Sequence, residues 1–541
     1  MFKITIYISV FLLSSLCGIQ SAAAKKDIEL AIGIIQRLGR ISTDEPIEEV
    51  TIDSTSGDWL KVDFPSESQS APIETKQVVL KVDTAPLDEP KLSEKLVLSD
   101  RATFETAEDS ANSWKKLGIE VEVAQPGRWQ VWAKRDVYNT PLVRRWLLHS
   151  LEANNYDDPY LDSEVLVRQA DIILEIEGEE YNYDEVEITS TNNLVKVNTT
   201  DKPQNARLYG GSLELQPNAH GEFTLVNHVP LETYLRGVVP YEIGANAPAQ
   251  AVAAQTIIAR TYALRNLRRF AVDDYQLCAT VHCQVYKGLN DANPTSDRAI
   301  AQTAGLVLTY DNELIDALYS STTGGITASF EDTWNGAARP YLQPVIDAPN
   351  PIWDLVKYPL NNEQTFRRFI SMSKGFNETV RKGVFRWNKT RSIADLNRDL
   401  RKYLQKTRHP LADFNTIRSM QVQRRSRSGR ILALTIETDR GKLQLHKNEI
   451  RSALEPPRST FFYLQPIYKD AKLDGYAFIG GGFGHGLGLS QYRSYNRAKL
   501  GWSAEQILAF YYPQTEIKPL DDTIVFWSDD TKSISKKSQS K

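Results

Sequence analysis

The sequence predicts an α+β protein in which strands dominate. Between residues 76 and 180, segments that alternate apolar and polar side chains at the strand period are interrupted by two segments of helical character. From about residue 183 onward, short strand-like segments separated by Gly/Asn turns precede one long Ala-rich, helix-favouring segment. A hydrophobic fraction of 41% can fill a core, so wholesale disorder and a disulfide-dense miniature scaffold are excluded.

The first 24 residues have the layout of a secretory signal peptide. Lys3 is the only charge before Lys25, an apolar run extends from Ile4 to Leu16, and residues 21–24 give an A-x-A-like end. The apolar run is shorter than the roughly 20 residues that a membrane span requires. We therefore expect an exported protein, periplasmic or associated with the cell wall. The alternative is an uncleaved segment that anchors the protein in the membrane.

An acidic segment follows the predicted signal peptide. Residues 41–110 carry 17 acidic and 6 basic side chains, a net charge of −11, whereas the whole chain has a formal charge of −4. We expect residues 25–75 to form an acidic, partly disordered linker, and the polar, lysine-rich residues 528–541 to form a disordered tail. The near-neutral total argues against a dedicated nucleic-acid binder, so no nucleic-acid partner is expected.

Residues 76–180 follow the order β-α-β-β-α-β, which is that of a ferredoxin-like split unit. The expected strands and helices are 78–82 (strand), 104–117 (helix), 119–123 and 129–133 (strands), 142–151 (helix) and 172–176 (strand). In this pattern the segment resembles the SPOR domain, a small module that binds peptidoglycan glycan stripped of its peptides. The same element order hosts many functions, so the resemblance concerns pattern alone.

The most informative block, residues 229–242, reads VPLETYLRGVVPYE. Pro240 is expected to end this apolar segment, because proline lacks a backbone donor and restricts the residue before it. A helix is expected from Ala249 to about Phe270, with Asn246 as its N-cap. Glu242 is thus expected in a short turn just ahead of that helix. The helix N-terminus would lower the carboxyl pKa, whereas burial would raise it.

Three further blocks follow in order: CATVHCQVYKG at 278–288, SSTTGG at 320–325 and GGGFGHGLGLSQY at 480–492. Together with residues 229–242, they resemble the SpoIID/LytB family, which contains stage II sporulation protein D, a peptidoglycan lytic transglycosylase, and the amidase enhancers. The resemblance covers roughly residues 185–520 and implies one large, strand-rich domain with a long helix after the Glu242 turn.

This resemblance implies that Glu242 is the catalytic residue of a transglycosylase, which cleaves between N-acetylmuramic acid and N-acetylglucosamine without adding water. An internal hydroxyl acts as the nucleophile, so the second carboxylate of an ordinary glycosidase is not needed. The substrate-binding residues that the resemblance implies are Arg260, Tyr262, Gln284, Tyr286, Ser320, Ser321, Gly324, Gly325, His485, Ser490, Gln491 and Tyr492. This chain departs from the family in having Arg493-Ser494 where Gly-Ala is usual.

Cys278 and Cys283 have two interpretations. Outside the cytoplasm they are expected to form a small disulfide loop. Alternatively, Cys278, His282 and Cys283 supply three zinc ligands, and some family members look zinc-bound in this region. Such a zinc would be structural, and the reaction requires no cofactor. A fourth ligand is not obvious in the sequence.

The leading hypothesis is an exported lytic transglycosylase that cleaves peptidoglycan glycan strands, with a preference for strands already stripped of their stem peptides. The alternative is a non-catalytic protein that binds glycan or an N-acetylmuramoyl-L-alanine amidase and raises amidase activity. A third interpretation is a structural cell-wall-binding protein. A transglycosylase and an amidase enhancer would both keep the same glycan-binding groove. The retention of Glu242 favours the transglycosylase.

Overall fold

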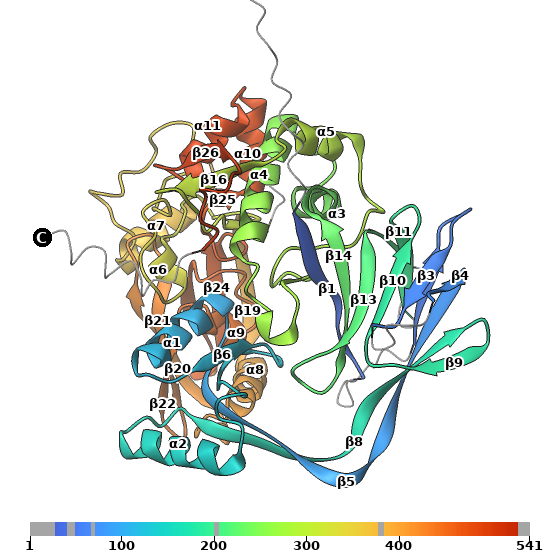
Figure 1. Cartoon of the computed structure of the whole chain (residues 1–541). Coiled ribbons are helices and arrows are strands. Elements are labelled where there is room, and N and C mark those ends of the chain that lie inside the picture. The colour runs from blue at the N-terminus through green and yellow to red at the C-terminus, as the bar shows by residue number, and fades with distance from the viewer. Residues whose placement is uncertain (1–27, 40–48, 66–70, 200–204, 377–382, 528–541) are drawn as a thin grey trace, which may run out of the picture.

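Two large β-sheets contain all the strands of the described part of the first 230 residues (Figure 1). The computed structural model describes residues 28–39, 49–65, 71–199, 205–376 and 383–527, and it is α+β as predicted. In the described residues the first sheet has the spatial order β15 (Leu277–Cys278), β1 (Glu29–Leu38), β14 (Phe223–Pro230), β13 (Ser212–Pro217), β10 (Val186–Ser190), β3 (Leu60–Asp63) and β4 (Ile73–Thr75).

The second sheet joins the N-terminal strands to those of the predicted SPOR-like segment. Its order is β12 (Arg207–Gly210), β11 (Leu194–Thr199), β2 (Glu49–Ser54), β5 (Gln77–Arg101), β7 (Trp129–Ala133) and β6 (Val121–Ala124). Off this path, β8 (Tyr160–Ile176) pairs with β5 and with β9 (Glu179–Asn182). In Figure 1, β5 and β8 form a long two-stranded ribbon that crosses the bottom of the view and connects the two halves of the molecule.

The C-terminal half contributes smaller sheets and most of the helices. Its strands are β16 (Leu306–Tyr310), β17 (Glu313–Leu314), β18 (Tyr319–Ser320), β19 (Arg386–Ser392), β20 (Ile417–Arg425), β21 (Ile431–Thr438), β22 (Lys442–His446), β23 (Phe462–Lys469), β24 (Lys472–Gly481), β25 (Leu489–Ser490) and β26 (Glu516–Pro519). The helices of the chain are α1 (Phe104–Lys116), α2 (Pro141–Ala153), α3 (Leu231–Ile243), α4 (Ala249–Arg265), α5 (Pro294–Gln302), α6 (Phe330–Thr333), α7 (Glu363–Ser371), α8 (Ile393–Lys406), α9 (Glu449–Ala453), α10 (Gln491–Lys499) and α11 (Ala504–Tyr511), with a 3₁₀ turn at Ala271–Asp273.

The predicted linker at residues 25–75 is wrong for its described part, which forms β1 to β4. Leu30 and Ile32 on β1 and Val50 and Ile52 on β2 are completely buried. Because successive strand residues point to opposite faces, these alternating apolar residues bury one face while acidic neighbours stay outside. On β1 and β2 the acidic residues Glu29, Glu49 and Asp53 are exposed or half-buried beside these buried positions.

The elements expected between residues 76 and 180 all form, and β8, β5, β7 and β6 lie side by side and antiparallel. They do not form a separate module. The first residues of β5 pair with β2, and one hydrophobic core includes Leu30, Phe104, Trp129 and Val238. A ferredoxin-like or SPOR module is therefore not confirmed, and the large domain also begins earlier than residue 185, because β1 pairs with β14.

Helices α3 and α4 hold the most informative block, and two local predictions here are wrong. Pro240 does not end the apolar segment but lies inside α3, which continues to Ile243. Asn246 is not the N-cap of α4, because Pro248 occupies that position without a side-chain hydrogen bond. The α4 helix is buried on nearly all sides, which explains why Ala is so frequent in it.

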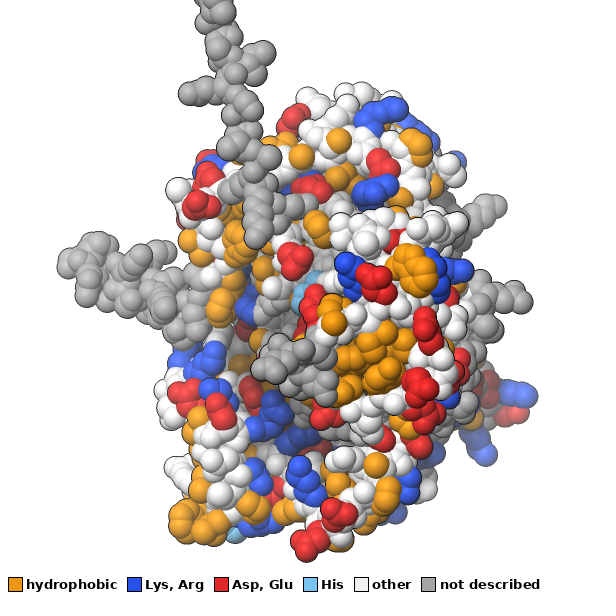
Figure 2. All heavy atoms as spheres, turned by 45° about the vertical axis from the view of Figure 1, so that its right-hand side comes forward, with side chains coloured by type: hydrophobic (Ala, Val, Ile, Leu, Met, Phe, Trp, Pro, Cys, Tyr) orange, Lys and Arg blue, Asp and Glu red, His pale blue; other side chains and the backbone are white. Residues whose placement is uncertain are grey.

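The predicted signal peptide at residues 1–24 and the predicted tail at 528–541 lie outside the described residues. Among the residues that are described, no helix combines the length and apolar character that crossing a membrane requires. On the face shown in Figure 2, Asp and Glu side chains gather at the right, whereas Lys and Arg side chains gather beside a hollow at the left centre. Elsewhere on this face the two signs of charge are interspersed.

Candidate active site around Glu242

Glu242 lies in the last turn of α3, one residue before the helix ends. The chain leaves the helix at Gly244, whose φ of 86° is in the region that favours glycine. The carboxyl therefore lies near the negative end of the α3 dipole, which disfavours its charged form. The sequence predicted that a helix N-terminus would lower the carboxyl pKa while burial raised it. The structure corrects this prediction, because the α3 dipole and burial both favour the protonated carboxyl.

Three groups donate hydrogen bonds to the Glu242 carboxyl. The backbone N–H of Val285 lies 2.8 Å from Oε1, and the Gln491 side-chain amide lies 3.5 Å from Oε2. The Tyr319 hydroxyl is the third donor. Burial raises the pKa of Glu242 above its ordinary value, and these three donors lower it in part. The net result is a raised carboxyl pKa, which is what a general acid near neutral pH requires.

Gln491 also closes the end of the helix that carries Glu242. Its Nε2 donates to the backbone carbonyl of Glu242 at 2.7 Å, which satisfies one of the carbonyls that a helix C-terminus leaves without a partner. Gln491 is the first residue of α10, so two helices almost 250 positions apart in the chain are fixed to each other at the site.

A chain of hydrogen bonds supports the Tyr319 hydroxyl. The Gln284 amide donates to Tyr319 Oη at 3.2 Å, and the Tyr234 hydroxyl donates to Gln284 Oε1 at 3.3 Å. Burial holds the pKa of Tyr319 well above its usual value, so this hydroxyl stays neutral and can donate. Gln284 thus contacts the carboxyl through Tyr319.

Glu242, Val285, Tyr319 and Gln491 line a cavity of 510 Å³, and the segment Ala102–Glu105 and Trp129 also contribute to its wall. Gln284, a predicted substrate-binding residue, is completely buried and lies outside the lining. Of the predicted substrate-binding residues, Tyr262, Ser320, Ser321, His485 and Gln491 line it, as do the candidate metal ligands His282 and Cys283. The hydroxyl of Ser320 is buried and has no hydrogen-bond partner in the described part of the chain. A space of this size accommodates a small saccharide.

His485 lies on the cavity wall as a neutral side chain. Its Nδ1 accepts a hydrogen bond from the backbone N–H of Leu487 at 3.0 Å, and the ring also bonds the backbone of Tyr319. Burial lowers the pKa of His485 to about 3, so it remains uncharged at neutral pH. A ring that contacts the backbone of Tyr319 positions that residue and does not act as an acid or base itself.

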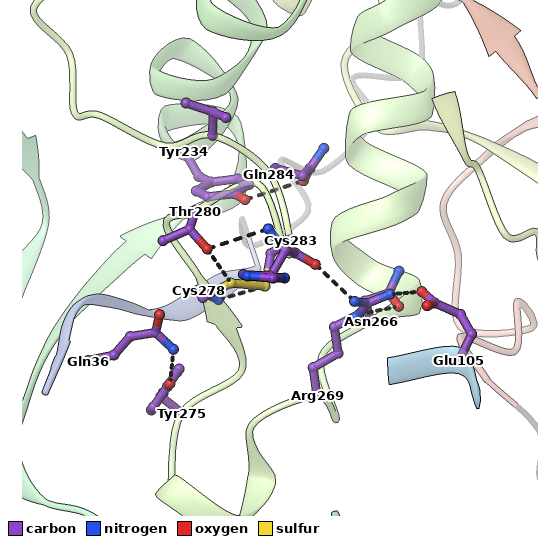
Figure 3. The surroundings of a disulfide bond; sticks show 12 residues. Gln36, Glu105, Tyr234, Asn266, Arg269, Tyr275, Cys278, Thr280, Cys283 and Gln284 are labelled. Atoms are coloured by element: carbon purple, nitrogen blue, oxygen red, sulfur yellow. Dashed lines mark hydrogen bonds and ion pairs between the residues drawn. A yellow bond between two sulfur atoms is a disulfide. The ribbon is translucent and has the colours of Figure 1, made fainter. Parts of the chain in front are cut away.

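Cys278 and Cys283 form a disulfide, the first of the two predicted alternatives (Figure 3). The zinc alternative does not fit, because bonded sulfurs are not thiolate ligands and His282 is exposed. Among the described residues, no group of three His, Cys, Asp or Glu side chains is arranged to hold a metal ion. The disulfide instead closes the loop that leads into Gln284 and Val285.

Several residues singled out from the sequence are structural. Arg260 is completely buried and forms a bidentate ion pair with Glu232 at 2.7 Å. Tyr286 is also completely buried, and its hydroxyl donates to Asn227 at 2.8 Å. Neither lines the cavity, so the structure does not support the substrate contacts expected of them.

Gly324, Gly325, Ser490 and Tyr492 also lie outside the lining of the cavity. A Cβ on Gly324 would lie 2.7 Å from the backbone nitrogen of Gly482. The glycines of these two blocks therefore allow two segments of the same chain to approach closely. Ser490 is buried on β25, and Tyr492 donates its backbone N–H to the Ser321 carbonyl at 3.2 Å.

The departure from the family at Arg493 has a structural explanation. Arg493 is completely buried and lies 3.4 Å from Asp347, which also receives Arg497 Nη2 at 2.8 Å and the Tyr511 hydroxyl at 2.6 Å. This network fixes α10 and α11 to the segment that contains Asp347. It supports the position of Gln491 without adding a group to the cavity.

The sequence interpretation missed the N-terminal contribution to the site. Phe104, Glu105 and Trp129 line the cavity, although they lie in the predicted SPOR-like segment. Glu105 pairs with Arg269 (Figure 3). The Arg269 guanidinium also donates to the His282 carbonyl at 3.0 Å. Tyr319 was missed as well, although it immediately precedes the SSTTGG block.

Residues 219–310, which contain Glu242, Gln284 and Val285, match the family model described as stage II sporulation protein. Residues 328–488 match a domain of unknown function, DUF8618. The chain is 29% identical over 304 residues to the amidase enhancer of Bacillus subtilis, a match that covers 52% of this chain and 40% of that protein.

It is 27% identical over 322 residues to stage II sporulation protein D of the same organism, over 55% of this chain and 76% of that protein. An uncharacterized protein of Brachyspira hyodysenteriae is 26% identical over 57% of this chain and 72% of its own length. These matches, together with the four ordered blocks that include Glu242, support similarity to the SpoIID/LytB family.

Proposed function

We propose that the protein is an exported peptidoglycan lytic transglycosylase, with Glu242 as its only catalytic acid and base. The observation that carries this proposal is the partly buried Glu242 carboxyl on the wall of a cavity, with a raised pKa and three donors. The similarity to stage II sporulation protein D and to an amidase enhancer supports a role in the cell wall.

The reaction starts with protonated Glu242. Its carboxylic acid gives a proton to the glycosidic oxygen while the bond from that oxygen to C1 of the muramic acid breaks. The C6 hydroxyl of the same sugar then bonds to C1, and the Glu242 carboxylate takes the hydroxyl proton. The products are a new 4-hydroxyl end and a 1,6-anhydro end, and Glu242 is protonated again without any water being consumed.

The surrounding donors match both stages of this cycle. Burial and the helix C-terminus favour the protonated acid that starts the reaction. The hydrogen bonds from Val285, Tyr319 and Gln491 stabilise the carboxylate that forms in the middle of it. The internal nucleophile competes with water because it is held next to C1.

The second candidate is a non-catalytic enhancer of a cell-wall amidase. The match to the B. subtilis amidase enhancer favours this candidate. In that case the cavity would bind glycan and present it, or the surface would bind the amidase, and the titration of Glu242 would have no consequence for product formation.

Incubating the mature protein with stripped and with intact peptidoglycan distinguishes the two. For the enzyme, mass spectrometry detects anhydromuramic ends with the protein alone, and more of them from the stripped glycan. For the enhancer, the protein alone yields no new ends on either substrate, and an added N-acetylmuramoyl-L-alanine amidase releases stem peptides faster.

A further inference from the structure

A second and larger hollow adjoins the Glu242 cavity. Its volume is 1090 Å³, and the two share the lining residues Ala102, Trp129, His282, Arg451, Ser452 and Phe483. We call this hollow the basic groove, because its lining includes Lys389, Lys402 and Lys406 together with five arginines. A chain bound along the groove can therefore continue into the cavity that holds Glu242.

The α8 helix forms one wall of the basic groove with a stripe of cations. Arg398, Lys402 and Lys406 follow one another at intervals of four residues, so they lie on the same face of the helix. The opposite face packs into the core through Leu396, Leu400 and Leu404. The stripe is therefore held in place by the burial of the other side of α8.

The three lysines that line the groove, one on β19 and two on α8, form no ion pair with the described acidic residues. Arg398 lies 2.9 Å from Asp395, and Arg391 lies 2.7 Å from Asp399, so these arginines are compensated. Lys389, Lys402 and Lys406 are exposed, and within the described ranges none of them forms an ion pair. Three unpaired positive charges thus face one groove.

The other walls add a buried donor and aromatic rings. Arg451 has a buried Nε without a hydrogen-bond partner in the described residues. Tyr403 and Phe483 line the groove as well, and exposed aromatic rings offer flat apolar faces for sugars. Positive charges interleaved with aromatic rings are suited to a polymer whose sugar units carry negative groups.

We infer that the basic groove binds a glycan strand that carries carboxylates and leads it to Glu242. This inference rests on the proposed function and extends it to residues 389–406, which lie outside the matched sporulation-protein region and inside the segment of unknown function. The carboxylates belong either to the lactyl groups of stripped strands or to the stem peptides of intact ones.

The test replaces the three groove lysines together, as Lys389→Gln, Lys402→Gln and Lys406→Gln. The control replaces Lys196, Lys472 and Lys499 by Gln, three exposed lysines outside the groove, so both variants lose the same charge. Co-sedimentation measures binding to stripped and intact glycan strands, and to the same strands with their carboxyls amidated. All variants carry Glu242→Gln, so that turnover does not change the ligand.

We expect the groove variant to bind carboxylate-bearing strands about tenfold more weakly, since each exposed contact contributes about 0.5 kcal/mol. The control variant should bind as tightly as the parent. Added salt should weaken the binding of strands to the parent. With amidated strands, the groove variant and the parent should bind equally. A loss on stripped strands assigns the lactyl carboxylates, and a loss on intact strands alone assigns the stem peptides.

Equal binding by the groove variant and its parent would overturn the inference, as would equal binding of amidated and unmodified strands. The outcome is independent of catalysis. If Glu242→Gln still releases anhydro ends, the proposed function fails. The difference in strand binding between the groove variant and its parent would still stand.

Discussion

The backbone N–H of Val285 donates a hydrogen bond to Oε1 of Glu242 over 2.8 Å. Val285 follows the Cys278–Cys283 loop by two residues, and Glu242 lies in the last turn of the α3 helix on the other side of the site. The disulfide loop therefore sets the position of a donor that stabilises the glutamate anion. Burial acts in the opposite direction, and the raised pKa of Glu242 is the balance of the two.

Replacing Tyr319 by Phe removes one donor to the Glu242 carboxylate. The pKa of Glu242 then rises further, and the fall of kcat/KM on the alkaline side moves to higher pH by about one unit, because a hydrogen bond to a charged group contributes about 1.5–3 kcal/mol. A pH profile on stripped glycan measures this. Tyr262→Phe is the matched control, since Tyr262 lines the same cavity without bonding the carboxyl. If the alkaline side of the pH profile did not move in Tyr319→Phe, the hydrogen bond from Tyr319 to Glu242 would be contradicted.

Glu242→Gln is expected to stabilise the folded protein near neutral pH. A carboxyl whose folded pKa is raised contributes stability below its unfolded pKa, and this contribution is lost as the pH rises through the folded value. The glutamine does not titrate and keeps an acceptor for Val285. The thermal midpoint of the variant should exceed that of the parent at pH 7, and the advantage should shrink or disappear at pH 4. An advantage that is the same at both pH values would contradict the raised pKa.

Replacing Cys278 and Cys283 together by Ser removes the disulfide. The expected loss is about 2 kcal/mol in the free energy of unfolding, because the closed loop is short. Glycan cleavage should also fall, since Val285 is no longer held against Glu242. A reducing agent should lower the thermal midpoint of the parent and leave the double variant unchanged. Full activity in the double variant would show that the loop does not position Val285.

Asp347→Asn leaves Arg493 and Arg497 buried without their anion. The free energy of unfolding should fall by about 3–5 kcal/mol, the range for breaking a buried ion pair. Glu74→Gln is the control, because its pair with Lys61 is exposed and should matter by less than about 1 kcal/mol. Chemical denaturation compares both with the parent; similar small losses would contradict a supporting role for the Asp347 network.

The centre of the site could be predicted from the sequence because its residues lie in the ordered blocks. Glu242, Gln284 and Gln491 come from three of them and meet in space. Tyr319 could not be found in this way, because one tyrosine among 24 gives no signal without its contacts. Arg260 was predicted from the family resemblance alone, and its partner Glu232 is identified only by the packing of α3 on α4.

The fold class and the elements between residues 76 and 180 followed from local periodicity. The N-terminal strands did not. The composition summed over residues 41–110 concealed the strand pattern of Val50 and Ile52, and the pattern of Leu30 and Ile32 in the preceding residues was not recognised. The sharing of one core by β1, α1 and α3 is a long-range property that no local pattern records. For the same reason, the contribution of Trp129 to the Glu242 cavity became visible only in the structure.

Digestion of stripped glycan in water enriched in ¹⁸O tests the role of Glu242. The parent protein should release 1,6-anhydro ends that contain no ¹⁸O, because the muramic C6 hydroxyl closes the ring, and Glu242→Gln should release none. Reducing ends labelled with ¹⁸O, or anhydro ends formed equally by Glu242→Gln, would contradict an internal transglycosylation by this glutamate.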